Sequence, residues 1–190
     1  MVRAAIQPAF VKFSKEAAII GRLLGGYTSL ELDLLLCVAM GTKDFDGTLK
    51  EMFGVRGETR RIDNAARLGR PPYAVHGLEA DFDAAIDAMR HCLAMRNQYA
   101  HYHFYDDYSG TLALVNLEEH AKSPHHVPDL TSLTTFHVDV ATLQAQEEYW
   151  HGADRLLFWL NYEWQFLAGK LNVRMAGDKP TLPAKPPLHI

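Results

Sequence analysis

The sequence predicts an all-α fold, a bundle of four to five helices with a small β-hairpin inserted near residues 105–117. Apolar residues recur at helical spacing along several long segments, only one short run has a β-like pattern, and neither an internal repeat nor a sustained heptad is present. A chain of 190 residues has the size of a single domain that can bury a core without a disulfide or a metal. We expect residues 1–177 to form that domain and the proline-rich residues 178–190 to be extended or disordered.

The first expected helix begins at Ser14, whose hydroxyl suits an N-terminal cap, and ends at Gly41-Thr42. Most of its apolar side chains recur three to four residues apart, as one face of a helix requires. Gly25 and Gly26 lie in the middle, and each glycine inside a helix costs about 1 kcal/mol relative to alanine. Because few polar turn residues accompany them, we expect one long helix.

A second helical region is expected from about residue 44 to residue 68, in two pieces around Gly54 and Gly57. It should stop at Arg70-Pro71-Pro72, because a proline cannot donate the backbone hydrogen bond of a helix. The third helix, from Leu78 to about Phe104, has the clearest periodicity. Its apolar stripe consists of Phe82, Ile86, Met89, Leu93, Ala100 and Phe104.

The chain changes character after the third helix. A turn cluster at residues 106–110 precedes the short β-like run 111–115, which predicts the hairpin. Residues from about 118 to 128 hold three histidines and two prolines and should form a loop. A last long helix is expected from about residue 140 to residue 171, and its many aromatic side chains indicate core and subunit contacts.

The composition excludes some classes of function. Apolar residues make up 48% of the chain and charged residues 22%, which is ordinary for a globular protein. The 23 acidic and 19 basic residues give a net charge of −4, which argues against a protein that coats nucleic acid or an anionic membrane over its whole surface. No signal peptide and no apolar run long enough to span a bilayer is evident. We expect a cytoplasmic protein with no membrane partner and with buried, reduced thiols at Cys37 and Cys92.

Polar side chains interrupt the apolar stripe of the third helix. Helical spacing after Leu93 requires apolar residues near two positions where the sequence supplies Arg96-Asn97 and Ala100-His101. Asn97 and His101 are four residues apart on one face, whereas Arg96 lies about 140° around the helix from His101. A buried polar network that holds the bundle in register accounts for such a cluster. A functional site accounts for it equally, because the arginine cation can bind a phosphate and the imidazole can gain and lose a proton near neutral pH.

The segment Arg96-Asn97-Gln98-Tyr99-Ala100-His101 resembles the R-x4-6-H motif of the HEPN superfamily, including the polar residue that usually follows the arginine. The segment lies near the end of a long expected helix in an all-helical chain, as in that family. The resemblance implies a HEPN-like bundle and metal-independent cleavage of RNA by a homodimer, in which two motif helices face each other across a composite cleft. Some HEPN toxins carry a tyrosine two places after the histidine; this sequence has His103 there and a tyrosine at position 102.

The resemblance also implies a role for each residue. His101 would be the general base or acid that acts on the ribose 2′-OH and the leaving oxygen, and Arg96 would bind and stabilise the scissile phosphate. Asn97 would orient His101 or the phosphate. The reaction would leave a 2′,3′-cyclic phosphate without a cofactor or a metal. The implied function is an endoribonuclease that serves as the toxin of a toxin–antitoxin pair or in defence, with RNA and an antitoxin protein as partners.

A group of arginines lies outside the motif, at residues 56, 60, 61, 67 and 70, and the segment that they span holds only two acids. We expect Arg56, Arg60 and Arg61, together with His103, to contact the RNA backbone, although a solvated helix face has the same composition.

Two other interpretations stay open. The histidines and acids at residues 101–107, or His120, His125 and His126, suggest a metal site. However, histidines two residues apart on a helix point away from each other and the loop spacing is irregular, so we expect no metal. The alternative function is a non-catalytic helical protein that binds RNA, a nucleotide or a partner and contains a structural Arg-Asn-His cluster. No serine or cysteine nucleophile motif and no phosphate-binding loop is present.

Overall fold

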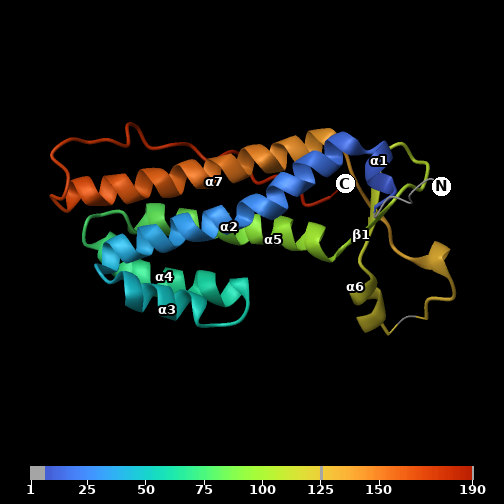
Figure 1. Ribbon diagram of the computed structural model, residues 1–190, viewed down its shortest axis with the longest axis horizontal. Helices are drawn as coiled ribbons and strands as arrows, with labels where there is room; N and C mark the ends of the chain where they lie inside the picture. Colours follow the sequence, from blue (N-terminus) through green and yellow to red (C-terminus); the bar gives the residue numbers. More distant parts are fainter. Residues whose placement is uncertain (1–6, 125, 190) are drawn as a thin grey trace, which may run out of the picture. The chain divides into compact units, whose positions relative to one another are not determined.

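The computed structural model describes residues 7–124 and 126–189, which are mostly helical and include one small sheet (Figure 1). The α-helices in these residues are α1 (Ala9–Lys12), α2 (Ser14–Thr42), α3 (Phe45–Phe53), α4 (Glu58–Ala74), α5 (Glu79–His101), α6 (Leu117–Lys122) and α7 (Val140–Leu167). The strands are β1 (His103–Tyr105), β2 (Leu112–Val115) and β3 (Phe136–Val138), and a 3-10 turn spans Leu130–Ser132. The predicted helical class with a small β insertion is confirmed.

The described residues divide into two compact units, each built from separate stretches of chain. Unit 1 comprises the residues up to Leu24, Met95–Glu147, and the residues from Pro186 onward. Unit 2 comprises Gly25–Ala94 and Glu148–Lys185. Helices α2, α5 and α7 each contribute residues to both units, so neither unit corresponds to one continuous segment of sequence.

Helix α2 continues through Gly25 and Gly26, as predicted. Gly26 has a packing role within unit 2, because a Cβ atom there would lie 2.9 Å from the ring of Trp150 in α7. By length and composition alone α2 could cross a membrane, a test that the core helix of a soluble protein also passes; 50% of its most apolar window is buried inside the protein.

Both cysteines lie in unit 2 and are buried, free thiols, as expected. Burial raises the pKa of Cys37 and of Cys92 to about 12. The Cys37 thiol donates to the carbonyl of Leu157 at 3.1 Å. Because a raised thiol pKa leaves little thiolate at neutral pH, neither cysteine has the character of a nucleophile.

Helices α3 and α4 form a helical hairpin in unit 2, and the break between them falls where the sequence predicts it (Figure 1). Gly57 at this break has a φ of 89°, a conformation that favours glycine. The two helices lie side by side: the Asn64 side chain donates to the Glu51 carbonyl at 2.6 Å, and Arg67 forms an ion pair with Glu51 at 2.7 Å.

Helix α4 does not stop at Arg70. It continues through Pro71 and Pro72 to Ala74, so the predicted stop is wrong. The prolines remove the two backbone N–H groups that would donate to the carbonyls of residues 67 and 68, and the helix continues for only two residues beyond them. Tyr73 is fully buried, and its hydroxyl donates to the Cys37 carbonyl at 3.2 Å, which fixes this last turn against α2.

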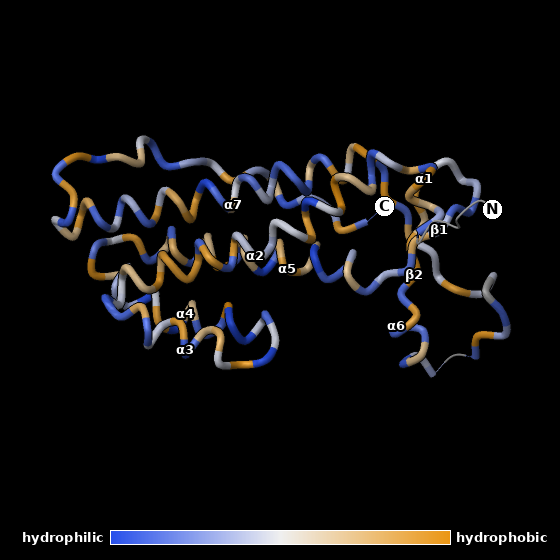
Figure 2. Tube along the Cα trace, viewed as in Figure 1, coloured by the Kyte–Doolittle hydropathy of each residue, from blue (hydrophilic) through white to orange (hydrophobic). Residues whose placement is uncertain are grey.

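Unit 1 contains an antiparallel sheet in the order β1-β2-β3. Strands β1 and β2 form the predicted hairpin, with Phe104 opposite Leu114. All four residues of β2 are buried, and Figure 2 shows this strand as an apolar segment. The sequence analysis missed β3, which places Phe136 opposite Leu114. A three-residue strand that pairs at long range has no turn signal beside it, and its hydrogen bonds depend on the tertiary fold.

The described chain beyond α7 has neither helix nor strand. In unit 2 it is held by ion pairs from Lys179 to Asp81 and from Lys185 to Asp87, the latter at 2.7 Å. This tail therefore packs on the helices. Helix α7 itself ends at Leu167, slightly earlier than expected, because a glycine with a φ of 69° follows shortly after.

Candidate functional site

The last turns of α5, in unit 1, present two polar faces. Met95, Gln98 and Tyr99 point inward, with exposed fractions of 1%, 5% and 2%. Ala100, which the sequence analysis places on the apolar stripe, is exposed. The buried stripe continues instead through Met95 and Tyr99, which are four residues apart, so the Arg-Asn-His cluster does not interrupt it.

The outward face carries the residues of the motif. Arg96 and Asn97 are half-buried, and His101, the last residue of α5, is exposed. The Arg96 guanidinium donates to Asn97 Oδ1 at 3.0 Å. Asn97 and His101 share one row of the helix surface, four residues apart. The hydrogen bond brings the guanidinium toward that row, which Arg96 would not reach from its own position about 140° away.

Three buried side chains and two backbone carbonyls, all within unit 1, join in one hydrogen-bond network. The Tyr99 hydroxyl donates to Gln146 Oε1 at 2.5 Å, and burial raises the pKa of Tyr99. Gln146 Nε2 donates to the carbonyls of Pro187 and Leu188 at 2.7 and 2.9 Å. Gln98 Nε2 donates to the same Leu188 carbonyl at 2.6 Å. The buried network that the sequence suggests does exist, but these glutamines and the tyrosine form it.

Ion pairs within unit 2 engage three of the five arginines between residues 56 and 70. Arg61 pairs with Glu31 at 3.1 Å, Arg67 with Glu51, and Arg70 with Asp83 at 2.8 Å. Arg56 and Arg60 are exposed and form no ion pair with any residue that the structure describes. These arginines belong to unit 2, whereas the motif and His103, an exposed residue at the start of β1, belong to unit 1.

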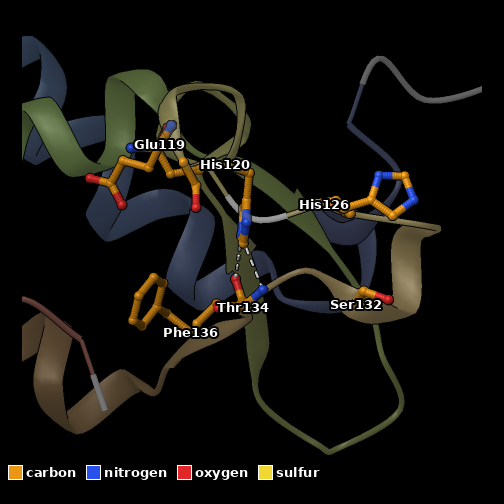
Figure 3. Close-up of a pocket in the computed structure, with 9 residues that line it drawn as sticks. Glu119, His120, His126, Ser132, Thr134 and Phe136 are labelled. Carbon is orange, nitrogen blue, oxygen red and sulfur yellow. Dashed lines mark hydrogen bonds between the residues drawn. The ribbon is translucent and has the colours of Figure 1, made fainter.

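A cavity of about 410 Å³ opens in unit 1 between α6 and the segment before β3 (Figure 3). Its lining combines imidazole, hydroxyl, amide and carboxylate groups from Asn116, Glu119, His120, Ser123, His126, Ser132 and Thr134, with Val127 and Phe136. His120 Nε2 accepts from the Thr134 backbone N–H at 3.0 Å, as the dashed line shows. This contact joins α6 to the segment before β3 at the wall of the cavity.

The loop histidines do not form a metal centre in the part of the chain that the structure describes. Across residues 7–124 and 126–189, no group of three or more histidine, cysteine, aspartate or glutamate side chains could hold a metal ion. His125 lies outside the described residues. His120 already uses Nε2 as an acceptor, which removes its more accessible ligand atom.

A second cavity, of about 370 Å³, lies in unit 2 and contains a carboxylate pair that the sequence analysis missed. Asp33 of α2 faces Asp154 of α7 there. Burial, together with the charge and hydrogen bond of Asp154, raises the pKa of Asp33 to about 6. The two residues are far apart in the sequence, so only the packing of α2 against α7 reveals the pair. The only signal in the sequence is an acid inside the apolar run of α2.

Compared with protein-family models, with curated proteins and with solved structures, the chain matches none. The function must therefore be argued from the geometry described above. In that geometry, the outward face of α5 is the place where a permanent cation, an amide and an imidazole lie on one surface of one helix.

Proposed function

We propose that this protein is a metal-independent endoribonuclease of HEPN type that acts as a homodimer. The observation that carries the proposal is the separation of two polar sets at the end of α5. Gln98, Tyr99 and Gln146 make the buried hydrogen bonds. The motif residues lie on the other side of the helix, where His101 is exposed, so the fold does not use them to fill its interior.

The proposed reaction is a transesterification. His101 accepts the proton of a ribose 2′-OH while the 2′ oxygen attacks the neighbouring phosphorus. The bond from phosphorus to the 5′ oxygen breaks, and the 5′ oxygen receives a proton from His101 of the second copy. The products are a 2′,3′-cyclic phosphate and a 5′-OH. Arg96 stabilises the charge that builds on the phosphoryl oxygens.

The contact between Arg96 and Asn97 supports these roles. Arginine is a permanent cation with several donors, so it can bind a phosphate and still donate to the Asn97 side chain. The bond restricts a long side chain that would otherwise lose entropy on binding RNA. Asn97 then orients the guanidinium, and through it the phosphate, toward the row that contains His101.

The remaining expectations are part of the same proposal. RNA reaches the site through local cations, because the net charge of −4 gives no general attraction. Arg56, Arg60 and His103 are exposed and can contact phosphates, whereas Arg61 is engaged by Glu31. We place the protein in the cytoplasm, as a toxin or a defence component with an antitoxin partner. The second candidate is a non-catalytic RNA or nucleotide binder, which is favoured because no described residue accepts from or donates to the His101 side chain and so orients it for proton transfer.

The test is cleavage of a generic single-stranded RNA in EDTA, with the products analysed for 2′,3′-cyclic phosphate ends. His101→Ala and Arg96→Ala should each reduce the cleavage rate by at least about a hundredfold. Their circular dichroism spectra should match that of the wild type. His151→Ala is the matched control, because His151 is an exposed histidine of unit 2. It should cleave at the wild-type rate.

Two results would contradict the proposal. A wild-type protein that binds RNA but never cleaves it would favour the non-catalytic binder. Unchanged cleavage in His101→Ala and Arg96→Ala would show that a contaminating nuclease, rather than the motif, produces the cleavage.

A further inference from the structure

We propose that Pro187, Leu188 and His189, here named the C-terminal clamp, position His101 by holding the end of α5. The inference rests on the proposed function for what His101 does, but the contacts that carry it do not depend on that function. All of them lie within unit 1. In this inference the clamp residues and their partners are positioning residues and do not touch the RNA.

The clamp binds the turn that precedes His101. Gln98 Nε2 donates to the Leu188 carbonyl at 2.6 Å, and the exposed fraction of Gln98 is 5%. Tyr99 reaches the same carbonyl through Gln146, which donates to both Pro187 and Leu188. Gln98 therefore depends on a backbone carbonyl of the clamp for its buried hydrogen bond, and Tyr99 bonds to a glutamine that the clamp holds.

The clamp also supports the residue that follows His101. The His189 ring stacks on the Phe136 ring, with centroids 4.0 Å apart and an interplanar angle of 21°. Phe136 in turn lies beside Tyr102, with ring centroids 6.0 Å apart. The Tyr102 backbone N–H donates to the Gln98 carbonyl at 3.1 Å, which closes the last turn of α5. His101 therefore sits between residues that contact the clamp, either directly or through one neighbour.

An exposed side chain on a terminal helical turn is ordinarily free to fray with that turn. Here the turn is fixed by buried amide groups, which lose hydrogen bonds if the turn opens. The buried hydrogen bonds on the inward face of α5 therefore keep its outward face ordered as well. This connection explains how the backbone that carries His101 can be held in place while the side chain stays exposed to a substrate.

The clamp can be weakened without disturbing the core. His189→Ala removes the ring stack, and His189 is only half-buried. We expect the amide protons of the last turn of α5 to exchange about tenfold faster in this variant. His189→Phe keeps an aromatic ring over Phe136 and should restore wild-type exchange. Lys185→Ala is the matched control, because it breaks the exposed ion pair with Asp87 in unit 2 and leaves the clamp intact.

A second variant acts on the buried contact. Gln98→Leu keeps the helix and the apolar environment but removes the donor to Leu188. It should raise exchange in the same turn. If this variant does not fold, the His189 series still decides the inference.

The effect of the clamp on activity is measured as single-turnover cleavage of RNA in EDTA. His189→Ala should lower the cleavage rate at saturating RNA about tenfold with little change in KM, since the clamp orders His101 and does not contact RNA. His189→Phe should recover the rate, and Lys185→Ala should not change it. A purely structural role would not produce this split between rate and KM, nor this rescue.

The two proposals fail in different ways. If the wild type cleaves no RNA, the proposed function fails, while the exchange experiment still supports or overturns the clamp. If His189→Ala and Gln98→Leu both keep wild-type exchange and cleavage, the clamp inference is overturned even though the enzyme is active.

Discussion

The two units bury polar side chains of different kinds. In unit 1, the buried glutamines Gln98 and Gln146 are neutral and bond to backbone carbonyls. In unit 2, the buried carboxylates Glu31 and Glu163 are charged and bond to Arg61 and Arg174. Among the described residues, the buried glutamines all lie in unit 1 and the buried glutamates all lie in unit 2.

This difference predicts which unit has a stability that depends on pH. A neutral amide keeps its hydrogen bonds at any pH near neutrality, so it can hold a candidate site in a fixed geometry. A buried carboxylate requires a partner, and removing that partner leaves an uncompensated charge. The interior of unit 1 should therefore be insensitive to pH, whereas the interior of unit 2 contains charged pairs.

The largest expected effect comes from breaking the network of unit 1. Tyr99→Leu removes a nearly fully buried ring and leaves Gln146 Oε1 without its donor. We expect a loss of about 3 kcal/mol in the free energy of unfolding, measured with urea. His101→Ala, two residues along the same helix, should change it by less than about 0.5 kcal/mol.

The contrast between these two variants tests the assignment of the two faces. If His101→Ala destabilises the protein as much as Tyr99→Leu, the motif belongs to the buried network and the enzyme proposal loses its main support.

The next effect comes from breaking a charged pair in unit 2. Arg61→Ala leaves the Glu31 carboxylate, whose residue is only 7% exposed, without its ion pair. We expect a loss of about 2 kcal/mol, lower than for a fully buried pair because the Arg61 side chain is 27% exposed. Arg60→Ala should be neutral within about 0.5 kcal/mol, because Arg60 is exposed. Equal effects in the two variants would show that the ion pair contributes nothing.

The smallest expected effect is the pH dependence that Asp33 gives to unit 2. The pKa of Asp33 is raised from 3.8 to about 6 in the folded protein. The folded state therefore binds this proton more readily than the unfolded state does. The resulting stability is fully present below about pH 4 and is lost as pH rises through about 6. The full shift corresponds to about 3 kcal/mol, and solvent screening of a half-buried carboxylate reduces it to about 1 kcal/mol.

Asp33→Asn checks this expectation. The variant cannot ionise at this position, so its stability relative to the wild type should increase between pH 4 and pH 8 by about 1 kcal/mol. The destabilisation by Tyr99→Leu should stay constant over the same range. A constant difference between Asp33→Asn and the wild type would show that the proton shared with Asp154 is not linked to folding.

Much of the fold could be predicted from the sequence, because long helices carry their own signal. The apolar positions of α2 and α5 repeat often enough to outweigh Gly25 and Gly26. The errors fall where tertiary contacts override a local rule. Buried Tyr73 keeps α4 helical past two prolines, and β3 depends on pairing with a strand distant in sequence. Short elements of this kind have no periodicity to detect.

At the candidate site, the sequence predicts where the polar cluster lies but not which residues are buried. Periodicity locates the polar cluster at the end of α5, but it places Ala100 inside and overlooks Tyr99. Ala100 is five full helical turns from Phe82 and so falls on the expected stripe, whereas Tyr99 lies about 100° around the helix from it. Near the end of α5 the buried face has turned toward Met95 and Tyr99. Gln98 donates to the backbone carbonyl of Leu188, and Gln146 donates to those of Pro187 and Leu188; no side-chain pattern reveals such partners.

The interleaving of the two units has a consequence for synthesis of the chain. Each unit begins before residue 95 and closes only with residues after 147, so neither can be completed while the ribosome is still translating α5. The amides of Gln98 and Gln146 receive their acceptors only once Leu188 has been made. Contacts that join such distant residues form slowly, because a long loop must close first. The end of α5 should therefore reach its final order late, only after residues 187 and 188 have left the ribosome.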